Sequence, residues 1–198
     1  LTHFEVALLG GDTVANRGDK RALGLTAIGA ATCSPVPARD GARVGDLIYV
    51  TGTLGDALAG FELIEAGFDE VGPLANAYNR PKPRLAEGRI LAPLVHAMMD
   101  ISDGLLLDAE RMASASAVEI AIDLSRVPLS TSYVSYRSDT LESRMQAASW
   151  GDDYELLFAA APDIEIKVAA TQVGYVREGA GLSLFDGERR LALPPSLG

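Results

Sequence analysis

The sequence predicts an α/β fold of the α+β type, in which helices cover one mixed β-sheet. Segments with strand patterns and segments with helical spacing follow one another without the strict βα alternation of a doubly wound parallel fold. The 198 residues are 48% hydrophobic and 22% charged. This composition is typical of a folded protein with a sizeable core, and it excludes intrinsic disorder.

The predicted strands are short runs of apolar, β-branched and aromatic residues. Residues 47–51 (LIYVT) form the clearest run, and residues 6–9 form an apolar run that ends at two glycines. Residues 23–31 alternate enough to predict a further strand. The remaining strands are predicted at 97–99, 118–122, 154–159 and 173–176, with a terminal hairpin at 182–186 and 190–193.

The predicted helices rest on apolar residues at helical spacing. Residues 56–66 and 105–116 each place apolar side chains on one stripe. A shorter helix is predicted over 85–94, and 128–145 has weak helical character. Residues 68–83 contain three prolines, so we expect loop and turn there.

Composition and charge exclude several classes of function. The net charge of −10 argues against binding to nucleic acids or anionic membranes. The single cysteine, Cys33, excludes a disulfide framework and a Cys-rich zinc site, and His3 and His96 are too few for a His-rich metal site. Any metal would be held by carboxylates, which favours Mg²⁺. No segment matches a signal peptide or a membrane span, so a cytoplasmic location is expected.

The segment 100–104 (DISDG) carries two carboxylates where a predicted strand enters a helix. Asp100 and Asp103 lie three residues apart and can face one side of the turn, where they would share a divalent cation. A charge that ends an apolar strand is costly when unpaired, and a cation would offset that cost. Alternatively, Ser102 or Asp103 caps the helix. The spacing alone leaves both interpretations open.

Two further acidic segments have similar alternatives. Residues 10–13 (GGDT) follow an apolar run, and their glycines would let a ligand approach the backbone, or they form a plain turn. Residues 150–155 (WGDDYE) hold adjacent carboxylates, which repel unless a positive charge lies between them. A cationic substrate would fit there, and Trp150 can supply a π face. The alternative is a solvated loop.

Basic residues suggest an anion site in this acidic protein. They are Arg39, Arg43, Arg80 and Arg84, and two prolines stiffen the segment 80–84 (RPKPR). Guanidinium groups bind phosphates in bidentate geometry, although an exposed basic loop is the alternative. Carboxylates suited to Mg²⁺ together with arginines suited to phosphates indicate phosphoryl transfer.

Five motifs carry a more specific signal. In chain order they are GGDT (10–13), ARDGARVGDLIYVTGTLGDALAG (38–60), NRPKPRL (79–85), MDISDGLLLD (99–108) and WGDDYELLF (150–158). Together they resemble the thiamine-monophosphate kinase family of the aminoimidazole ribonucleotide synthetase-like superfamily. The resemblance implies that residues 1–198 are mainly the C-terminal α/β domain of that superfamily. It also implies that the family's N-terminal nucleotide-binding and dimerisation domain is missing from the chain.

The resemblance further implies an activity and a set of site residues. The activity is ATP- and Mg²⁺-dependent phosphorylation of thiamine monophosphate to thiamine diphosphate, by direct in-line transfer, in a homodimeric enzyme. By motif position, the implied Mg²⁺ ligands are Asp12, Asp100 and Asp103, the implied ATP contacts are Gly11, Asp12, Arg39 and Ser102, and the implied substrate contact is Asp152.

The chain departs from the family pattern at two motifs. WGDD stands where the family usually has GGED, and Lys82 stands where it usually has Thr. Two alternatives to this activity stay open. One is another ATP-dependent kinase or synthetase of the same superfamily, and the other is a non-catalytic module that binds Mg²⁺ and a nucleotide.

Overall fold

The computed structural model describes residues 6–13, 18, 22–68 and 72–198, and the chain divides into two units, 1–30 and 31–198. His3 lies outside the described residues. Residues 6–13 and 22–31 form neither strand nor helix, so the strands predicted at 6–9 and 23–31 are wrong. Their apolar side chains are exposed, as at Leu8 (75%) and Leu25 (87%). A strand requires a hydrogen-bonded neighbour, which an alternating pattern alone does not supply.

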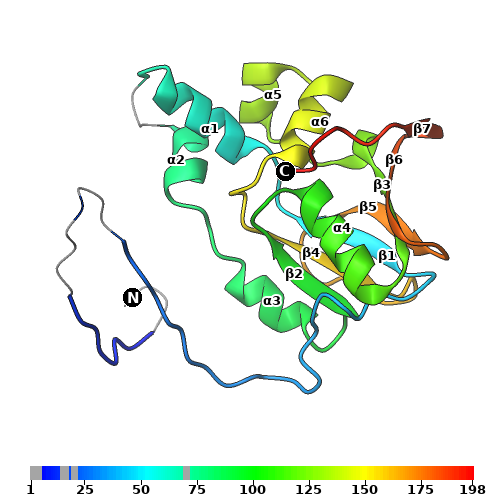
Figure 1. Ribbon diagram of the computed structural model, residues 1–198, viewed down its shortest axis with the longest axis horizontal. Coiled ribbons are helices and arrows are strands. Elements are labelled where there is room, and N and C mark those ends of the chain that lie inside the picture. The colour runs from blue at the N-terminus through cyan, green and yellow to red at the C-terminus, as the bar shows by residue number, and fades with distance from the viewer. Residues whose placement is uncertain (1–5, 14–17, 19–21, 69–71) are drawn as a thin grey trace. The chain divides into compact units, whose positions relative to one another are not determined.

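The second unit is built on a seven-stranded mixed sheet (Figure 1). Its strands are β1 (Leu47–Thr51), β2 (Ala97–Ile101), β3 (Glu119–Asp123), β4 (Glu155–Ala160), β5 (Ala170–Arg177), β6 (Gly181–Asp186) and β7 (Arg189–Leu191). The order across the sheet is β2-β4-β1-β5-β3-β6-β7, and all neighbours are antiparallel except the parallel pair β3 and β6. The predicted mixed sheet covered by helices is therefore confirmed for this unit.

The helices of this unit are α1 (Asp56–Glu65), α2 (Pro73–Asn79), α3 (Leu85–Leu91), α4 (Leu105–Ser116), α5 (Thr131–Arg137) and α6 (Leu141–Ser149). The weakly helical segment 128–145 contains α5 and the first residues of α6, because Ser130 and Thr140 each cap a helix start through the side chain. Helix α2 lies inside the predicted loop, and Pro73 opens it at the first helical position, where proline is tolerated. None of the helices in the described ranges is long and apolar enough to cross a membrane.

The core follows the alternation of side chains along the strands. Ile48, Val50 and Leu157 face the main core, which the apolar stripe of α4 completes on that face of the sheet (Figure 1). The alternate residues Tyr49 and Phe158 stack on the other face, with ring centroids 5.3 Å apart. Packing on both faces fixes β2 and β4, whose ends carry the acidic segments.

Candidate active site

The two acidic segments 100–104 and 150–155 meet at one end of the sheet. Strands β2 and β4 are antiparallel, and Ile101 pairs with Glu155, so β2 ends where β4 begins. Beyond the ladder, the amide of Asp152 donates to the Ser102 carbonyl at 3.0 Å, and the amide of Tyr154 donates to the Ile101 carbonyl at 2.9 Å. The structure thus joins the DISDG turn to the WGDDYE loop, although they lie far apart in the sequence.

Two glycines allow this close approach. A Cβ atom on Gly151 would lie 2.2 Å from the Ser102 carbonyl oxygen, which is far inside van der Waals contact. Gly104 has a φ of +106°, and a Cβ atom there would lie 2.6 Å from the Ser149 carbonyl oxygen. Because both obstructing atoms belong to the backbone, a side chain at either position would push the two segments apart.

Asp100 and Asp103 are exposed at this end of the sheet. Asp100 lies on β2, which is an edge strand, so the expected cost of a buried charge does not arise. Helix α4 begins after Gly104 without a side-chain cap bond, so the predicted cap by Ser102 or Asp103 is wrong. The Asp108 carboxylate accepts from the amides of this turn instead.

The described residues contain no group of three or more His, Cys, Asp or Glu side chains arranged to hold a metal ion. Mg²⁺ nevertheless uses few protein ligands in phosphoryl-transfer sites, usually one or two carboxylates completed by water and substrate phosphates. Two exposed carboxylates on one turn, Asp100 and Asp103, fit that kind of site. Asp12 belongs to the first unit, where its carboxylate accepts from the Thr13 amide at 2.7 Å. Its role as a metal ligand stays a prediction.

The adjacent carboxylates Asp152 and Asp153 point to different surroundings. Asp153 accepts from the amides of Gly55 (2.9 Å) and Ala57 (3.3 Å) at the start of α1, and burial of its carboxylate raises its pKa to about 7. Asp152 accepts from the Tyr154 hydroxyl at 3.3 Å.

Two residues of this loop adopt a left-handed backbone conformation, with φ values of +65° at Asp152 and +51° at Tyr154. This conformation is unfavourable for residues other than glycine, and it is frequent at functional sites. The loop is therefore held in a strained shape at the position where a substrate contact is predicted.

Arg84 was predicted as an anion ligand, and the structure places it in an internal ion pair. Its Nε and Nη2 atoms donate to the two carboxylate oxygens of Glu155 at 2.6 and 2.5 Å. Glu155 also accepts from the Thr51 hydroxyl at 2.6 Å. The other predicted phosphate contact, Arg39, is exposed and lies at the opposite end of β2, because its neighbour Ala38 bridges to Ala97.

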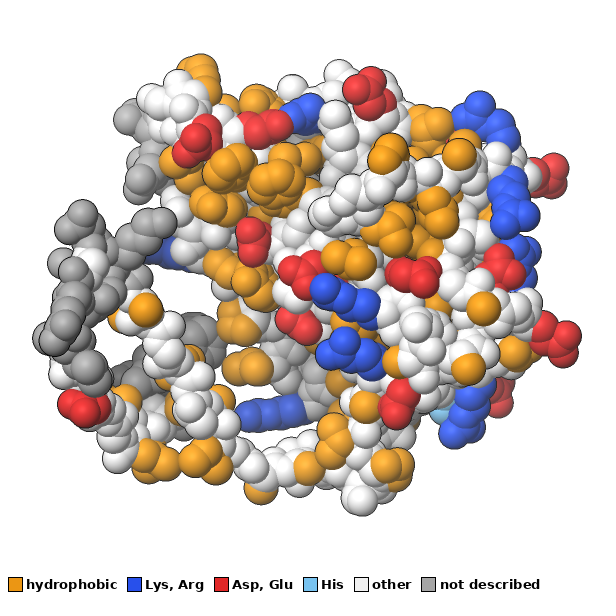
Figure 2. All heavy atoms as spheres, viewed as in Figure 1, with side chains coloured by type: hydrophobic (Ala, Val, Ile, Leu, Met, Phe, Trp, Pro, Cys, Tyr) orange, Lys and Arg blue, Asp and Glu red, His pale blue; other side chains and the backbone are white. Residues whose placement is uncertain are grey.

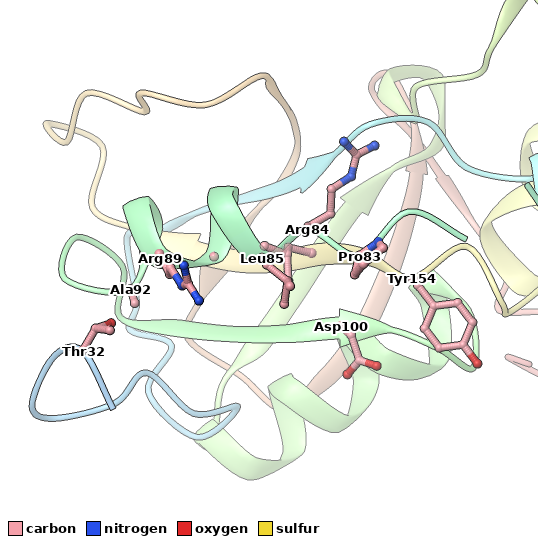
Figure 3. A pocket seen from close by; sticks show the side chains of 10 residues that line it. Thr32, Pro83, Arg84, Leu85, Arg89, Ala92, Asp100 and Tyr154 are labelled. Carbon is pink, nitrogen blue, oxygen red and sulfur yellow. The ribbon is translucent and has the colours of Figure 1, made fainter. Parts of the chain in front are cut away.

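A cleft of about 430 Å³ opens beside Asp100. We call it the α3 cleft, and its lining includes Pro83, Leu85, Gly88, Asp100, Tyr154 and Leu156. Figure 3 shows Asp100 and Tyr154 at one end of this cleft, Leu85 in its middle and the Arg84 guanidinium turned away from Asp100. An apolar wall beside a carboxylate suits a flat organic group that carries a positive charge.

A second cleft of about 240 Å³ lies between α1, α2 and the RPKPR segment. Its lining includes the basic residues Arg80 and Lys82 and the acidic residues Asp56 and Asp153. Arg80 and Lys82 thus line this cleft, and Arg84, although paired with Glu155, lines both clefts.

The indole ring of Trp150 packs against another aromatic side chain. Its ring stacks on Phe61 with centroids 5.3 Å apart, and Phe61 in turn contacts Tyr78 at 5.5 Å. One face of the indole, which was expected to be available to a cationic substrate, is thus covered by Phe61.

The two edges of the sheet differ in their charges. At the edge formed by β6 and β7, Arg189 and Arg190 lie beside acidic residues, and Figure 2 shows basic and acidic side chains mixed on that side. The carboxylates Asp100 and Asp103 lie at the end of β2, which is the opposite edge strand. A negative site of this kind suits a cation or a cation-bound phosphate.

The sequence profile described as "AIR synthase related protein, C-terminal domain" matches residues 43–187. The chain belongs to this family. The match covers the strands and helices that build the sheet end described above, including the DISDG turn and the WGDDYE loop.

Curated relatives in the family are thiamine-monophosphate kinases. The chain is 34% identical to that of Caulobacter vibrioides over 196 residues, which cover 92% of this chain and 55% of the relative. It is 36% identical to that of Aquifex aeolicus, over 76% of this chain and 51% of the relative. The chain thus spans about half the length of the curated relatives it matches.

Solved structures agree with this relationship. A structure described as AaThiL complexed with AMPPCP and TMP superposes with a TM-score of 0.71 at 35% identity, over 81% of this chain and 52% of that chain. The thiamine-monophosphate kinase of Stenotrophomonas maltophilia gives 0.70 at 33%, over 77% and 54%. Escherichia coli HypE gives 0.65 at 20% identity, over 85% and 56%, which shows a common fold alone.

Proposed function

We propose that this chain is the C-terminal part of an enzyme that phosphorylates thiamine monophosphate with ATP and Mg²⁺. In the reaction, the bond between the γ-phosphorus of ATP and the oxygen that bridges the β- and γ-phosphates breaks, and ADP leaves with that oxygen. A bond from that phosphorus to a phosphate oxygen of thiamine monophosphate forms, giving thiamine diphosphate. The observation that carries the proposal is the pair of backbone hydrogen bonds joining the DISDG turn to the WGDDYE loop, at 3.0 and 2.9 Å.

Each segment has a distinct task in this proposal. Asp100 and Asp103 would hold Mg²⁺, which neutralises the phosphates of ATP when it is bound. Asp152 would face the positively charged ring of the thiamine, and the apolar α3 cleft beside Asp100 offers a surface for a flat group. Because direct transfer needs mainly positioning and charge neutralisation, the chain needs no nucleophile of its own.

The remaining residues extend the site toward ATP. Gly11, Asp12, Ser102 and Arg39 are proposed ATP contacts, with Asp12 as a further Mg²⁺ ligand, on the strength of their motif positions. A homodimer and a cytoplasmic location are proposed on the resemblance to the kinase family. The other kinases or synthetases of the superfamily and a non-catalytic binding module are outcomes of the test below.

The test is a kinetic comparison of two substitutions in the protein that carries this chain. Asp103→Asn is expected to abolish Mg²⁺-dependent thiamine diphosphate formation, because removing a ligand charge weakens metal binding. Asp152→Asn is expected to raise the KM for thiamine monophosphate more than it lowers kcat. Asp163→Asn, in an exposed loop, serves as the matched control. Full activity of Asp103→Asn would refute the metal assignment, and ATP binding without turnover in the unmodified protein would favour the binding module.

A further inference from the structure

Asp108 is a fully buried carboxylate for which the proposed reaction has no direct use. Its exposed fraction is 0%, and it lies in the first turn of α4. Its Oδ2 atom accepts from the amides of Ser102 and Asp103, both at 3.0 Å. A buried carboxylate is retained only where it is well paired, so these bonds account for its position.

The two amides that Asp108 holds belong to the segment between the proposed metal ligands. Fixing the Ser102 and Asp103 amides restricts the backbone between the Cα atoms of Asp100 and Asp103. It also holds the turn against the start of α4, which has no other side-chain cap. The carboxylate therefore acts across the turn: it faces inward, and the Asp100 and Asp103 side chains are exposed on the outside.

Arg111 links the buried carboxylate to one of the exposed ones. Its Nη1 atom donates to Asp108 Oδ1 at 2.9 Å and also contacts Asp103 Oδ2. The Arg111 side chain is 39% exposed and that of Asp103 is 53% exposed, so solvent reaches this contact. A cation that binds Asp103 must compete with the guanidinium for the same carboxylate.

We infer that Asp108 is a positioning residue that preorganises the Mg²⁺-binding turn, and that Arg111 is the counter-charge that holds Asp103 until the metal binds. The metal part of this inference rests on the proposed function, whereas the bracing of the turn does not. Residues that orient metal ligands typically change metal affinity 10- to 100-fold when they are replaced. Asp108 and Arg111 are expected to act in opposite directions, because one assembles the site and the other repels a cation.

The first measurement follows the turn itself. Hydrogen exchange of the backbone amides of residues 102 and 103 is compared in the unmodified protein and in Asp108→Asn, which keeps the side-chain size. We expect exchange at both amides at least about tenfold faster in the variant, since the ionic acceptor is lost. Asp139→Asn is the matched control, because Asp139 pairs with Arg144 at the surface and lies outside this turn. Unchanged exchange would overturn the bracing role.

The second measurement follows metal binding, with Mn²⁺ alone as the probe and its paramagnetic resonance signal as the readout. Asp108→Asn is expected to raise the Kd for Mn²⁺ at least tenfold, and Arg111→Gln to lower it several-fold. If Asp108→Asn speeds exchange but leaves the Kd unchanged, the carboxylate only starts the helix, and the positioning role is refuted.

Two further outcomes are decisive. If Asp108→Asn does not fold, the Kd of Arg111→Gln for Mn²⁺ tests whether the guanidinium competes with the metal for Asp103. Weaker or unchanged Mn²⁺ binding in Arg111→Gln would overturn the counter-charge role. If the unmodified protein binds no Mn²⁺, the metal part of the inference fails together with the metal assignment of the proposed function. The hydrogen-exchange measurement would still test separately whether Asp108 restrains the amides of Ser102 and Asp103.

Discussion

At the scale of single residues, Asp153 shows how one loop can separate two adjacent carboxylates. The carboxylate of Asp152 accepts from the Tyr154 hydroxyl, whereas that of Asp153 turns toward the first amides of α1. Burial raises the pKa of Asp153 to about 7 even though both amide contacts favour its charged form. The burial cost of the charge thus exceeds the gain from two hydrogen bonds.

This pKa predicts a dependence of stability on pH. The folded chain keeps the Asp153 proton up to about pH 7, whereas the unfolded chain, with an ordinary carboxyl group, loses it near pH 4. Between these values the folded state binds more protons, so its free energy of unfolding falls as the pH rises, by up to about 1.4 kcal/mol per pH unit. Asp153→Asn should lack this component.

Urea unfolding of both proteins between pH 4 and pH 8 provides the measurement. The free-energy difference between the unmodified protein and Asp153→Asn should change steadily up to about pH 7 and then level off. Parallel curves over the whole range would show that the Asp153 carboxyl is ionised in the folded protein.

Single residues also show which side-chain partners could not be predicted from the sequence. The acidic segments 100–104 and 150–155 were identified correctly as neighbours of strand ends, whereas the strand predicted before segment 10–13 is wrong. Arg84 was interpreted as a ligand for an anion. Its partner Glu155 lies on another strand, and nothing in the segment 80–84 indicates that pairing. Asp108 was likewise overlooked, although a charge after the apolar run 105–107 is a signal that it is held by a local partner.

At the scale of elements, the Arg84–Glu155 pair joins the segment before α3 to the first residue of β4. The two side chains are only 18% and 9% exposed. Arg84→Met would leave the Glu155 carboxylate buried with the Thr51 hydroxyl as its neutral partner, and we expect a loss of about 3–5 kcal/mol in the free energy of unfolding.

Chemical denaturation measures this loss, with Arg189→Met as the matched control. Arg189 pairs with Asp186 at the surface, where the side chains are 63% and 35% exposed, so its loss should cost about 0.2–1 kcal/mol. Equal losses in the two variants would mean that the buried Arg84–Glu155 pair contributes no more to the free energy of unfolding than the exposed Arg189–Asp186 pair.

A second prediction at this scale concerns the contact between the two acidic segments. Gly151→Ala places a Cβ atom 2.2 Å from the Ser102 carbonyl oxygen, so the WGDDYE loop must move away from the DISDG turn. We expect a loss of about 1–3 kcal/mol in the free energy of unfolding and a lower kcat/KM for thiamine monophosphate. Gly29→Ala meets no atom within 4 Å and serves as the control. A Gly151→Ala protein with normal stability and kinetics would contradict the requirement for close approach.

Most elements of the second unit were predictable because their apolar residues repeat with the period of the structure they form. Helix α4 has the predicted bounds, and β1 does as well. Helix α2 was overlooked because the three prolines of residues 68–83 were taken as loop signals, although Pro73 occupies a position that favours a helix start. The strands predicted at 6–9 and 23–31 failed because a periodic pattern does not reveal whether a neighbouring strand exists.

At the scale of the whole molecule, the predicted class of a mixed sheet covered by helices is confirmed for residues 31–198. The strand order was beyond the reach of sequence patterns, because pairings such as the parallel contact of β3 and β6 depend on the packing of the complete sheet. That order is what brings β2 beside β4 and thereby creates the site. The motif series predicts the chemistry, and the sheet topology explains why two of its motifs, DISDG and WGDDYE, lie side by side.

The most direct test of the proposed function is product formation from thiamine monophosphate, ATP and Mg²⁺ by the intact protein, with its mass determined in parallel. We predict that thiamine diphosphate and ADP form in equal amounts and that omission of Mg²⁺ stops the reaction. If a protein of the length of its kinase relatives forms no thiamine diphosphate but phosphorylates another small molecule, the assignment of thiamine monophosphate as the substrate is contradicted.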